Sequence, residues 1–156
     1  MKLKLTQLQY KILFMKVKEI VNAYKVLGEA KVSNLEESEI KKIVLNRKAM
    51  RNIVEEFEAF LKDCQEKFKP ENWDELQSKI QQWQQEGDKT TLSEEERIAI
   101  NKTIIEYQVK INNAIKEEEN RIVEINVEKL SEESITRLLK HNDWQTSKLD
   151  DISILL

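Results

Sequence analysis

The chain has 156 residues, and its 26 Lys and Arg against 29 Asp and Glu give a formal net charge of −3. With only two Gly, one Pro, one Cys and one His, it cannot form a glycine-rich phosphate loop, an internal disulfide or a Cys/His zinc site within one chain. Residues 1–4 do not open a signal peptide, and no apolar run reaches the length of a membrane span. We therefore expect a single cytoplasmic domain over residues 1–156, with no cofactor.

At the N-terminus, apolar and polar residues alternate over residues 1–6, which predicts a short half-buried strand. From about Gln7 the apolar spacing changes to three or four residues, as on one face of a helix. This face holds Tyr10, Phe14, Val17, Val21, Tyr24 and Leu27. The predicted helix ends at Gly28, since a left-handed backbone at a helix end suits glycine.

A long uninterrupted helix is predicted next. Ser33-Asn34-Leu35-Glu36 has the spacing of a capping box, in which two side chains satisfy free amides at a helix start, and a second start would fit a few residues later. No Gly or Pro follows until Pro70. The helix would therefore have about 33 residues and a length of roughly 50 Å.

Two further helices are predicted between Pro70 and residue 120. Pro70 fits the first turn of a shorter helix, which Gly87 ends. Its apolar stripe holds Trp73, Leu76, Ile80 and Trp83. Ser93 and Glu96 form a second capping box, and the helix after them is nearly as long as the second one. We expect the two long helices to pack antiparallel.

Over residues 122–128, apolar and polar residues alternate again, and this pattern predicts a second strand. A lone strand is unstable, so we pair it with residues 1–6. This pairing would set Lys2 and Lys4 against Glu124 and Glu128, as opposite charges on neighbouring strands favour.

The C-terminal part of the chain predicts two short helices. Ser131 caps the first, and Thr146 or Ser147 begins the second. The predicted fold class is therefore mainly α: a helical bundle that contains a long antiparallel helical hairpin, together with a small two-stranded sheet.

Basic residues form two candidate binding surfaces. Lys11, Lys18 and Lys25 recur every seven residues and would make a ridge on one helix face. Such a ridge is typical of a phosphate-binding surface. The net negative charge and the absence of Arg from the ridge favour instead a solvated face, or one that contacts the acidic residues 70–120. A second cluster on the long helix holds Lys41, Lys42, Arg47, Lys48 and Arg51, which we interpret first as a solvated helix face.

No catalytic constellation is predicted. Cys64 lies on the apolar stripe of the long helix and is expected to be a buried small hydrophobe. His141 lies near the end of a short helix and has no assigned role, and no serine lies in a nucleophile elbow. The Glu-x-x-His motif of a di-metal bundle is absent. We therefore expect neither enzymatic activity nor a metal site.

Trp144 stands in a polar loop between the two C-terminal helices. Two readings stay open for it. It would either cover the small sheet or present an exposed anchor to a partner, because Trp is enriched among interface hot spots.

The order of elements resembles small uncharacterised, mainly helical proteins of bacteriophages and prophages. The resemblance rests on four segments: Met1-Lys2-Leu3-Lys4-Leu5, Glu55-Glu56-Phe57, Ser93-Glu94-Glu95-Glu96 and Leu149-Asp150-Asp151-Ile152-Ser153-Ile154-Leu155-Leu156. It implies a phage origin, and hence the host cytoplasm, but no mechanism and no functional residue.

The predicted function is that of a non-enzymatic protein–protein interaction protein. If the resemblance holds, it would be a phage accessory factor or an inhibitor that binds a host protein or a defence complex. The alternatives are a nucleic-acid-binding regulator that uses the ridge of Lys11, Lys18 and Lys25, and a phage structural or assembly protein. A homodimer would be compatible with the apolar surface of the long helices. The expected partner-binding residues are Lys11, Lys18, Lys25, Lys41, Lys48, Arg51 and Trp144.

Overall fold

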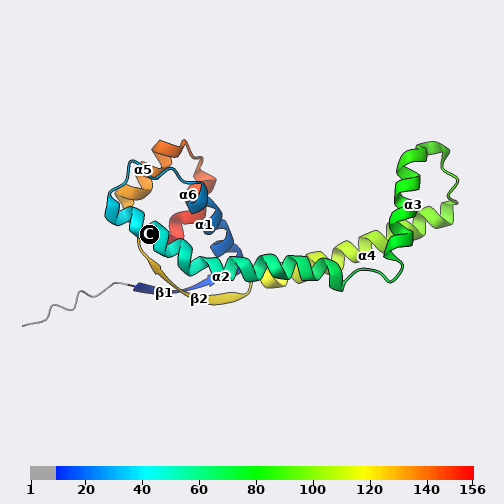
Figure 1. The fold of residues 1–156 in the computed structure, drawn as a ribbon, viewed down its shortest axis with the longest axis horizontal. Helices are drawn as coiled ribbons and strands as arrows, with labels where there is room; N and C mark the ends of the chain where they lie inside the picture. The colour runs from blue at the N-terminus through cyan, green and yellow to red at the C-terminus, as the bar shows by residue number, and fades with distance from the viewer. Residues whose placement is uncertain (1–9) are drawn as a thin grey trace, which may run out of the picture. The chain divides into compact units, whose positions relative to one another are not determined.

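The structure is a computed structural model that describes residues 10–156 (Figure 1). The strands are β1 (Tyr10–Lys16) and β2 (Ile122–Glu128), and the helices are α1 (Val17–Glu29), α2 (Glu37–Lys67), α3 (Trp73–Glu86), α4 (Glu94–Glu119), α5 (Glu132–Asn142) and α6 (Thr146–Ile152). Short 3₁₀ turns follow α3 and α6. The prediction of a mainly helical protein with a small two-stranded sheet is confirmed.

The described chain divides into two compact units. Unit 1 contains residues up to Glu58 and from Glu119 onward, and unit 2 contains Ala59–Glu118. The long helix α2 contributes its first 22 residues, Glu37–Glu58, to unit 1 and its end to unit 2. The expectation of a single domain concerns cooperative folding and stays a prediction.

The sheet pairs β1 with β2 in antiparallel register, so that Tyr10 lies opposite Glu128 and Lys16 opposite Ile122. The prediction of a strand over 122–128 is confirmed, but its partner is Tyr10–Lys16 and not residues 1–6. The predicted strand over 1–6 lies outside the described residues. The predicted match of Lys2 and Lys4 with Glu124 and Glu128 is therefore not the pairing that forms the sheet.

The helix predicted from Gln7 begins only at Val17, and this prediction was wrong for residues 10–16. Residues 12–15 form a short continuous apolar run, which fits a helix or a strand, and the aromatic and β-branched residues of the segment fit a strand once β2 supplies a partner. Two hydrogen bonds mark the start of the helix. The Lys16 N–H donates to Glu19 Oε2 at 2.8 Å, and the Val17 N–H donates to the carbonyl of Arg121, at the residue before β2, at 3.0 Å.

The core of unit 1 joins the inner face of the sheet to α1, α2, α5 and the C-terminus. Figure 1 shows these elements gathered around the N-terminal half of α2. The best buried side chains are Met15, Val17, Ile20, Ala23, Val26, Met50, Val127, Leu138, Ile152 and Leu155. The Leu130 N–H donates to the Leu155 carbonyl at 2.8 Å, so the apolar C-terminus is held beside the residues that follow β2.

Unit 2 has its own smaller core. Leu76, Leu92 and Ile100 are buried together, and Trp73, Ile80, Trp83 and Ile104 pack against them. The prediction that Trp73 and Trp83 are packing residues is confirmed. The Tyr107 hydroxyl donates to the Gln65 carbonyl at 2.9 Å, so within this unit α4 lies beside the end of α2.

Several predicted helix ends are confirmed. Ser93 and Glu96 form the predicted capping box, with the Glu96 N–H donating to Ser93 Oγ at 3.1 Å and the Ser93 N–H to Glu96 Oε2 at 2.9 Å. The Ser131 hydroxyl accepts from the Ser134 N–H. Gly87 ends α3 with a φ of 56°, a value that glycine adopts without strain.

The helix predicted to end near Gly28 ends at Glu29, and α2 begins at Glu37, at the later of its two predicted starts. The roles predicted for Gly28 and Ser33 were wrong, because tertiary contacts decide both. Gly28 does not have the left-handed backbone of a helix end, and a Cβ at this position would meet Arg47 Nη2 at 2.8 Å. The small residue therefore makes room for a guanidinium rather than ending the helix. Ser33 does not form a capping box, since its hydroxyl lies 3.0 Å from His141 Nε2 and α2 begins only at Glu37.

Candidate protein-interaction surface

The outer face of the sheet is unusually apolar for an exposed surface. Ile12 is 55% exposed, Phe14 73% and Ile122 55%. Because side chains alternate along a strand and Ile122 lies opposite Lys16, these three residues share one face. Glu124, opposite Phe14, and Lys16 add one charge of each sign. We call these five residues the outer sheet face.

A groove of about 320 Å³ continues this surface between β2 and α2. It is lined by Leu45, Asn46, Lys48, Ala49, Asn126 and Glu128. Asn126 lies directly opposite Ile12 in the sheet, so the groove adjoins the outer sheet face. Leu45 is 43% exposed, which leaves an apolar wall open to an occupant.

Asn46 lies beneath the groove and is only 1% exposed. Its Nδ2 donates to the Glu128 carbonyl at 2.8 Å, and its Oδ1 accepts from the Glu128 N–H at 2.7 Å. Both polar groups of this buried amide are therefore satisfied by one residue of β2, as burial requires. This pair of bonds fixes the end of β2 against α2 and so sets the shape of the groove.

Glu39 ties α2 to the start of α5. It lies next to Lys42 Nζ at 2.7 Å and accepts from the Ser131 N–H at 3.2 Å. Burial acts to raise the pKa of this carboxyl, but hydrogen bonds from Lys42, Ser131 and Ser134 outweigh it, and the pKa falls below its ordinary value of 4.5. The charged form is therefore the one that the folded state favours.

Replacing Glu39 by glutamine is expected to lower the free energy of unfolding at pH 7 by about 1–2 kcal/mol, since the variant loses a charged hydrogen bond. A carboxyl whose pKa is lower in the folded than in the unfolded state stabilises the folded state. This stabilisation is complete at pH values above the pKa of the unfolded state, and it is lost as pH falls through the pKa of the folded state. The deficit should therefore shrink below about pH 4. Urea unfolding from pH 7 to pH 3 measures it. Glu36→Gln, at an exposed residue, is the control; an equal deficit at every pH would contradict the prediction.

Arg47 belongs to the packing between α1 and α2. Its guanidinium carbon lies 4.3 Å from the centre of the Tyr24 ring, over the helix turn that contains Gly28. Placement over an aromatic face is favourable for a guanidinium. The basic cluster predicted on α2 is thus not one solvated face, because Lys42 and Arg47 are half-buried while Lys41, Lys48 and Arg51 are exposed.

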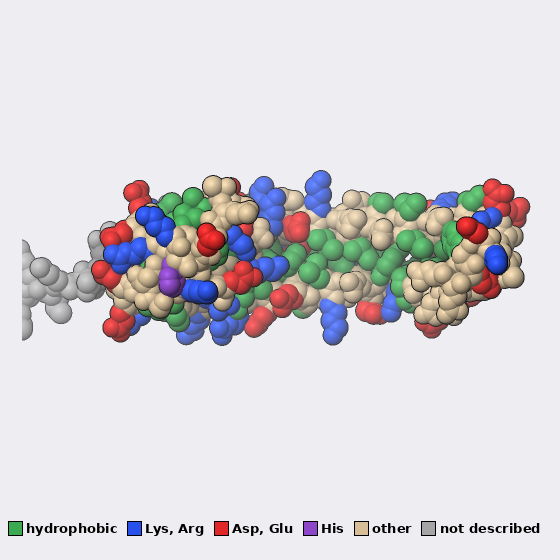
Figure 2. All heavy atoms as spheres, turned by 90° about the horizontal axis from the view of Figure 1, so that it is seen from above, with side chains coloured by type: hydrophobic (Ala, Val, Ile, Leu, Met, Phe, Trp, Pro, Cys, Tyr) green, Lys and Arg blue, Asp and Glu red, His purple; other side chains and the backbone are tan. Residues whose placement is uncertain are grey.

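The predicted lysine ridge is not a continuous helix face. Lys11 belongs to β1, whereas Lys18 and Lys25 are exposed on α1. On α2, Lys41 pairs with Glu37 at 3.7 Å between exposed side chains. Figure 2 shows acidic and basic side chains interspersed on the face that it draws. The predicted ridge is therefore reduced to Lys18 and Lys25 on α1, and the nucleic-acid alternative stays a prediction.

Two other predicted contact residues, Lys48 and Arg51, lie on α2 with exposed side chains. The structure brings Lys48 to the groove and Arg51 to neither the groove nor the sheet. Trp144, between α5 and α6, is half-buried, and its backbone N–H donates to the Leu139 carbonyl at 3.1 Å. Both readings of Trp144 stay predictions.

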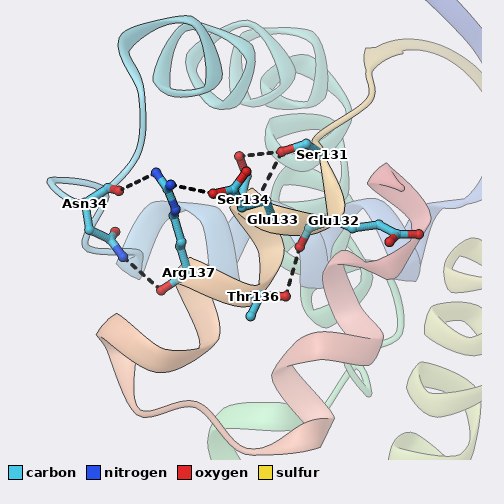
Figure 3. A network of polar contacts seen from close by, with 7 residues as sticks. All are labelled: Asn34, Ser131, Glu132, Glu133, Ser134, Thr136 and Arg137. Carbon is cyan, nitrogen blue, oxygen red and sulfur yellow. Dashed lines mark hydrogen bonds and ion pairs between the residues drawn. The ribbon is translucent and has the colours of Figure 1, made fainter.

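Helix α5 makes polar contacts with the turn that precedes α2 (Figure 3). Asn34 Nδ2 donates to the Arg137 carbonyl at 3.0 Å, and Arg137 reaches both the Asn34 carbonyl and the Glu133 carboxylate. His141, which had no predicted role, contacts Ser33 on the same side of α5. These contacts join segments about 100 residues apart in the chain and explain why the turn is ordered.

The Ser33–His141 pair lacks the third member of a catalytic triad. Among residues 10–156, no carboxylate hydrogen-bonds to the other ring nitrogen of His141, and such a group is needed to orient the base. Cys64 is buried, and burial together with nearby Asp63 and Glu118 raises the pKa of its thiol, against the effect of Lys67. A raised pKa leaves little reactive thiolate.

In the described part of the chain, no group of three or more His, Cys, Asp or Glu side chains is placed so that it could hold a metal ion. Over the same residues, no helix combines the length and apolar character needed to cross a membrane.

Comparisons with protein-family models, with curated proteins and with solved structures find no match. The arrangement of residues therefore carries the functional argument.

Sequence reasoning missed the residues that make this surface. Ile12 and Phe14 were assigned to a helix, although the short apolar run of residues 12–15 between Lys11 and Lys16 fits a strand as well. Asn46 was also missed. Its position between Ile43 and Met50 on the buried face of α2 was a detectable signal, since a polar residue in an apolar stripe needs a buried partner.

Proposed function

We infer that this chain is a non-enzymatic protein–protein interaction protein that binds its partner through the outer sheet face and the adjoining groove. The observation that carries the proposal is the exposure of Ile12, Phe14 and Ile122 on one face. Covering a large apolar side chain is worth about 1.5–3 kcal/mol, and contiguous apolar patches with a charged rim are typical of interaction sites.

The identity of the partner is suggested only by the resemblance seen in the sequence. A host protein or defence complex, as the phage resemblance implies, stays a prediction, and so does a cytoplasmic location. A homodimer is the alternative that the surface allows, because Lys16 and Glu124 would let two copies complement each other.

The test compares partner capture by two doubly substituted variants. Ile12→Ser with Phe14→Ser removes the apolar part of the outer sheet face. Ile98→Ser with Ile105→Ser is the matched control, because these residues of α4 are 60% and 61% exposed. Both variants should keep the helical circular dichroism of the parent chain, since exposed positions are changed.

We expect a protein captured from a lysate of the source cells to be lost with the sheet-face variant and retained with the control. Sedimentation of the purified chain separates this result from self-association. Equal capture by both variants, or loss with the α4 variant alone, would show that the outer sheet face is not the binding surface.

A further inference from the structure

We propose that the free edge of β2 binds an extended segment of the partner protein as an added strand, and that this segment carries Lys or Arg opposite Glu124. The inference rests on the proposed function and specifies how the partner is bound. Three features of the groove carry it: the bonding of Asn46, the direction of the β2 peptide groups, and the charge of the edge.

Asn46 occupies one position of the free edge in the way that a neighbouring strand would. A residue on an adjacent antiparallel strand exchanges two hydrogen bonds with its partner, one from an N–H and one to a carbonyl. The Asn46 amide makes the same two bonds with Glu128, at 2.8 and 2.7 Å. This edge of β2 therefore already binds an amide group in strand geometry.

At the next positions of the edge, the described part of the chain supplies no partner. Because peptide groups alternate in direction along a strand, those of Asn126 and Glu124 face the same edge as those of Glu128. Within residues 10–156, no hydrogen bond from outside the sheet reaches the backbone of Asn126 or Glu124. Unpaired strand edges of this kind are templates for strand addition, a common mode of peptide recognition.

The groove provides room and contacts beside the open edge. Asn126 lines it from β2, and Leu45 and Ala49 line it from α2. Side chains on one face of an added strand would therefore contact this apolar wall. Those on the other face would extend the outer sheet face, where the residue opposite Glu124 is next to a carboxylate.

Charge favours a different protein over a second copy. Antiparallel pairing of two β2 edges along the whole of Ile122–Asn126 would set Glu124 against Glu124, and like charges directly opposite each other are destabilising. A basic residue at that place is favourable instead. Lys48 lines the groove together with Glu128, so at that end of the edge the chain itself supplies a basic side chain beside the carboxylate. We therefore expect the basic residue of the partner opposite Glu124 and not opposite Glu128.

The test uses a synthetic nine-residue peptide in which threonine and leucine alternate and the central threonine is replaced by lysine. Fluorescence anisotropy measures its binding to the full chain. We expect a peptide with central glutamate to bind about tenfold more weakly. A lysine peptide N-methylated at the central lysine and at the threonine two positions away on each side should lose binding. These amides face β2, and methylation removes the hydrogen bonds that they would donate to it.

Two variants of the chain complete the test. Glu124→Lys should reverse the preference between the lysine and glutamate peptides. Asn126→Pro should abolish binding while the β1–β2 pairing is kept, because proline is tolerated where the N–H faces a free edge. No binding of the lysine peptide, equal binding of its N-methylated form, or an unchanged preference in Glu124→Lys would overturn the inference.

Partner capture separates this inference from the proposed function. Loss of capture with Ile12→Ser and Phe14→Ser, but not with Asn126→Pro or Glu124→Lys, would contradict strand addition and leave the interaction surface in place. Capture that none of these variants changes would contradict both.

Discussion

Asn46→Ala is expected to lower the free energy of unfolding by about 2–4 kcal/mol, a large part of the stability of a small protein. The substitution removes two hydrogen bonds and leaves the N–H and the carbonyl of Glu128 without their partner at a site where Asn46 itself is 1% exposed. Unpaired buried backbone groups bear the full cost of desolvation. Urea unfolding followed by circular dichroism measures the change.

The control is Asn52→Ala, at an exposed position of the same helix. It makes the same chemical change and should alter stability by less than about 0.5 kcal/mol. Asn46→Asp provides a second comparison. It keeps the acceptor for the Glu128 N–H but sets a carboxylate oxygen against the Glu128 carbonyl, so it should destabilise at least as much as alanine. Equal losses in Asn46→Ala and Asn52→Ala would contradict this role for the buried amide.

The elements that local patterns encode could be predicted from the sequence. The alternation over residues 122–128 matches β2, and the capping box at Ser93 and Glu96 marks the start of α4. The absence of Gly and Pro between residues 29 and 69 matches the 31-residue helix α2. Each of these signals depends on residues within a few positions of one another, so no tertiary information is needed.

The segment over residues 10–16 shows where such reasoning fails. Its short apolar run fits both a helix and a strand, so the local pattern cannot decide between them. The pairing with β2, more than 100 residues away in the chain, selects the strand. Assigning this segment to a helix also left Ile12 and Phe14 unrecognised as neighbours on one face of a sheet, which hid the outer sheet face.

Contacts between distant elements account for the remaining errors. Gly28 has the residue type of a helix end, but its role is to admit the Arg47 side chain from α2. Ser33 has the residue type of a cap, but its hydroxyl contacts His141 on α5. Of the predicted contact residues, Lys48 alone lines the groove. The sequence identifies polar and charged residues, but which of them share a surface depends on the packing.

Leu138→Ala is expected to lower the free energy of unfolding by about 2–5 kcal/mol, because it removes most of a fully buried side chain and leaves a cavity. Leu138 is 0% exposed in the core of unit 1. The adjacent Leu139 is half-buried on the same helix, so Leu139→Ala removes the same atoms with less loss of packing. Denaturant unfolding of both variants compares the two positions directly.

The pair also tests whether α5 supports the interaction surface. Because α5 and the sheet belong to unit 1, conditions that unfold Leu138→Ala but not Leu139→Ala should abolish partner capture by the first variant only. Capture should return when the temperature or denaturant concentration is lowered, since no residue of the outer sheet face is changed. Equal stability of the two variants would contradict the role of Leu138 in the core that holds the sheet. Loss of capture that persists after refolding would indicate that α5 contacts the partner directly.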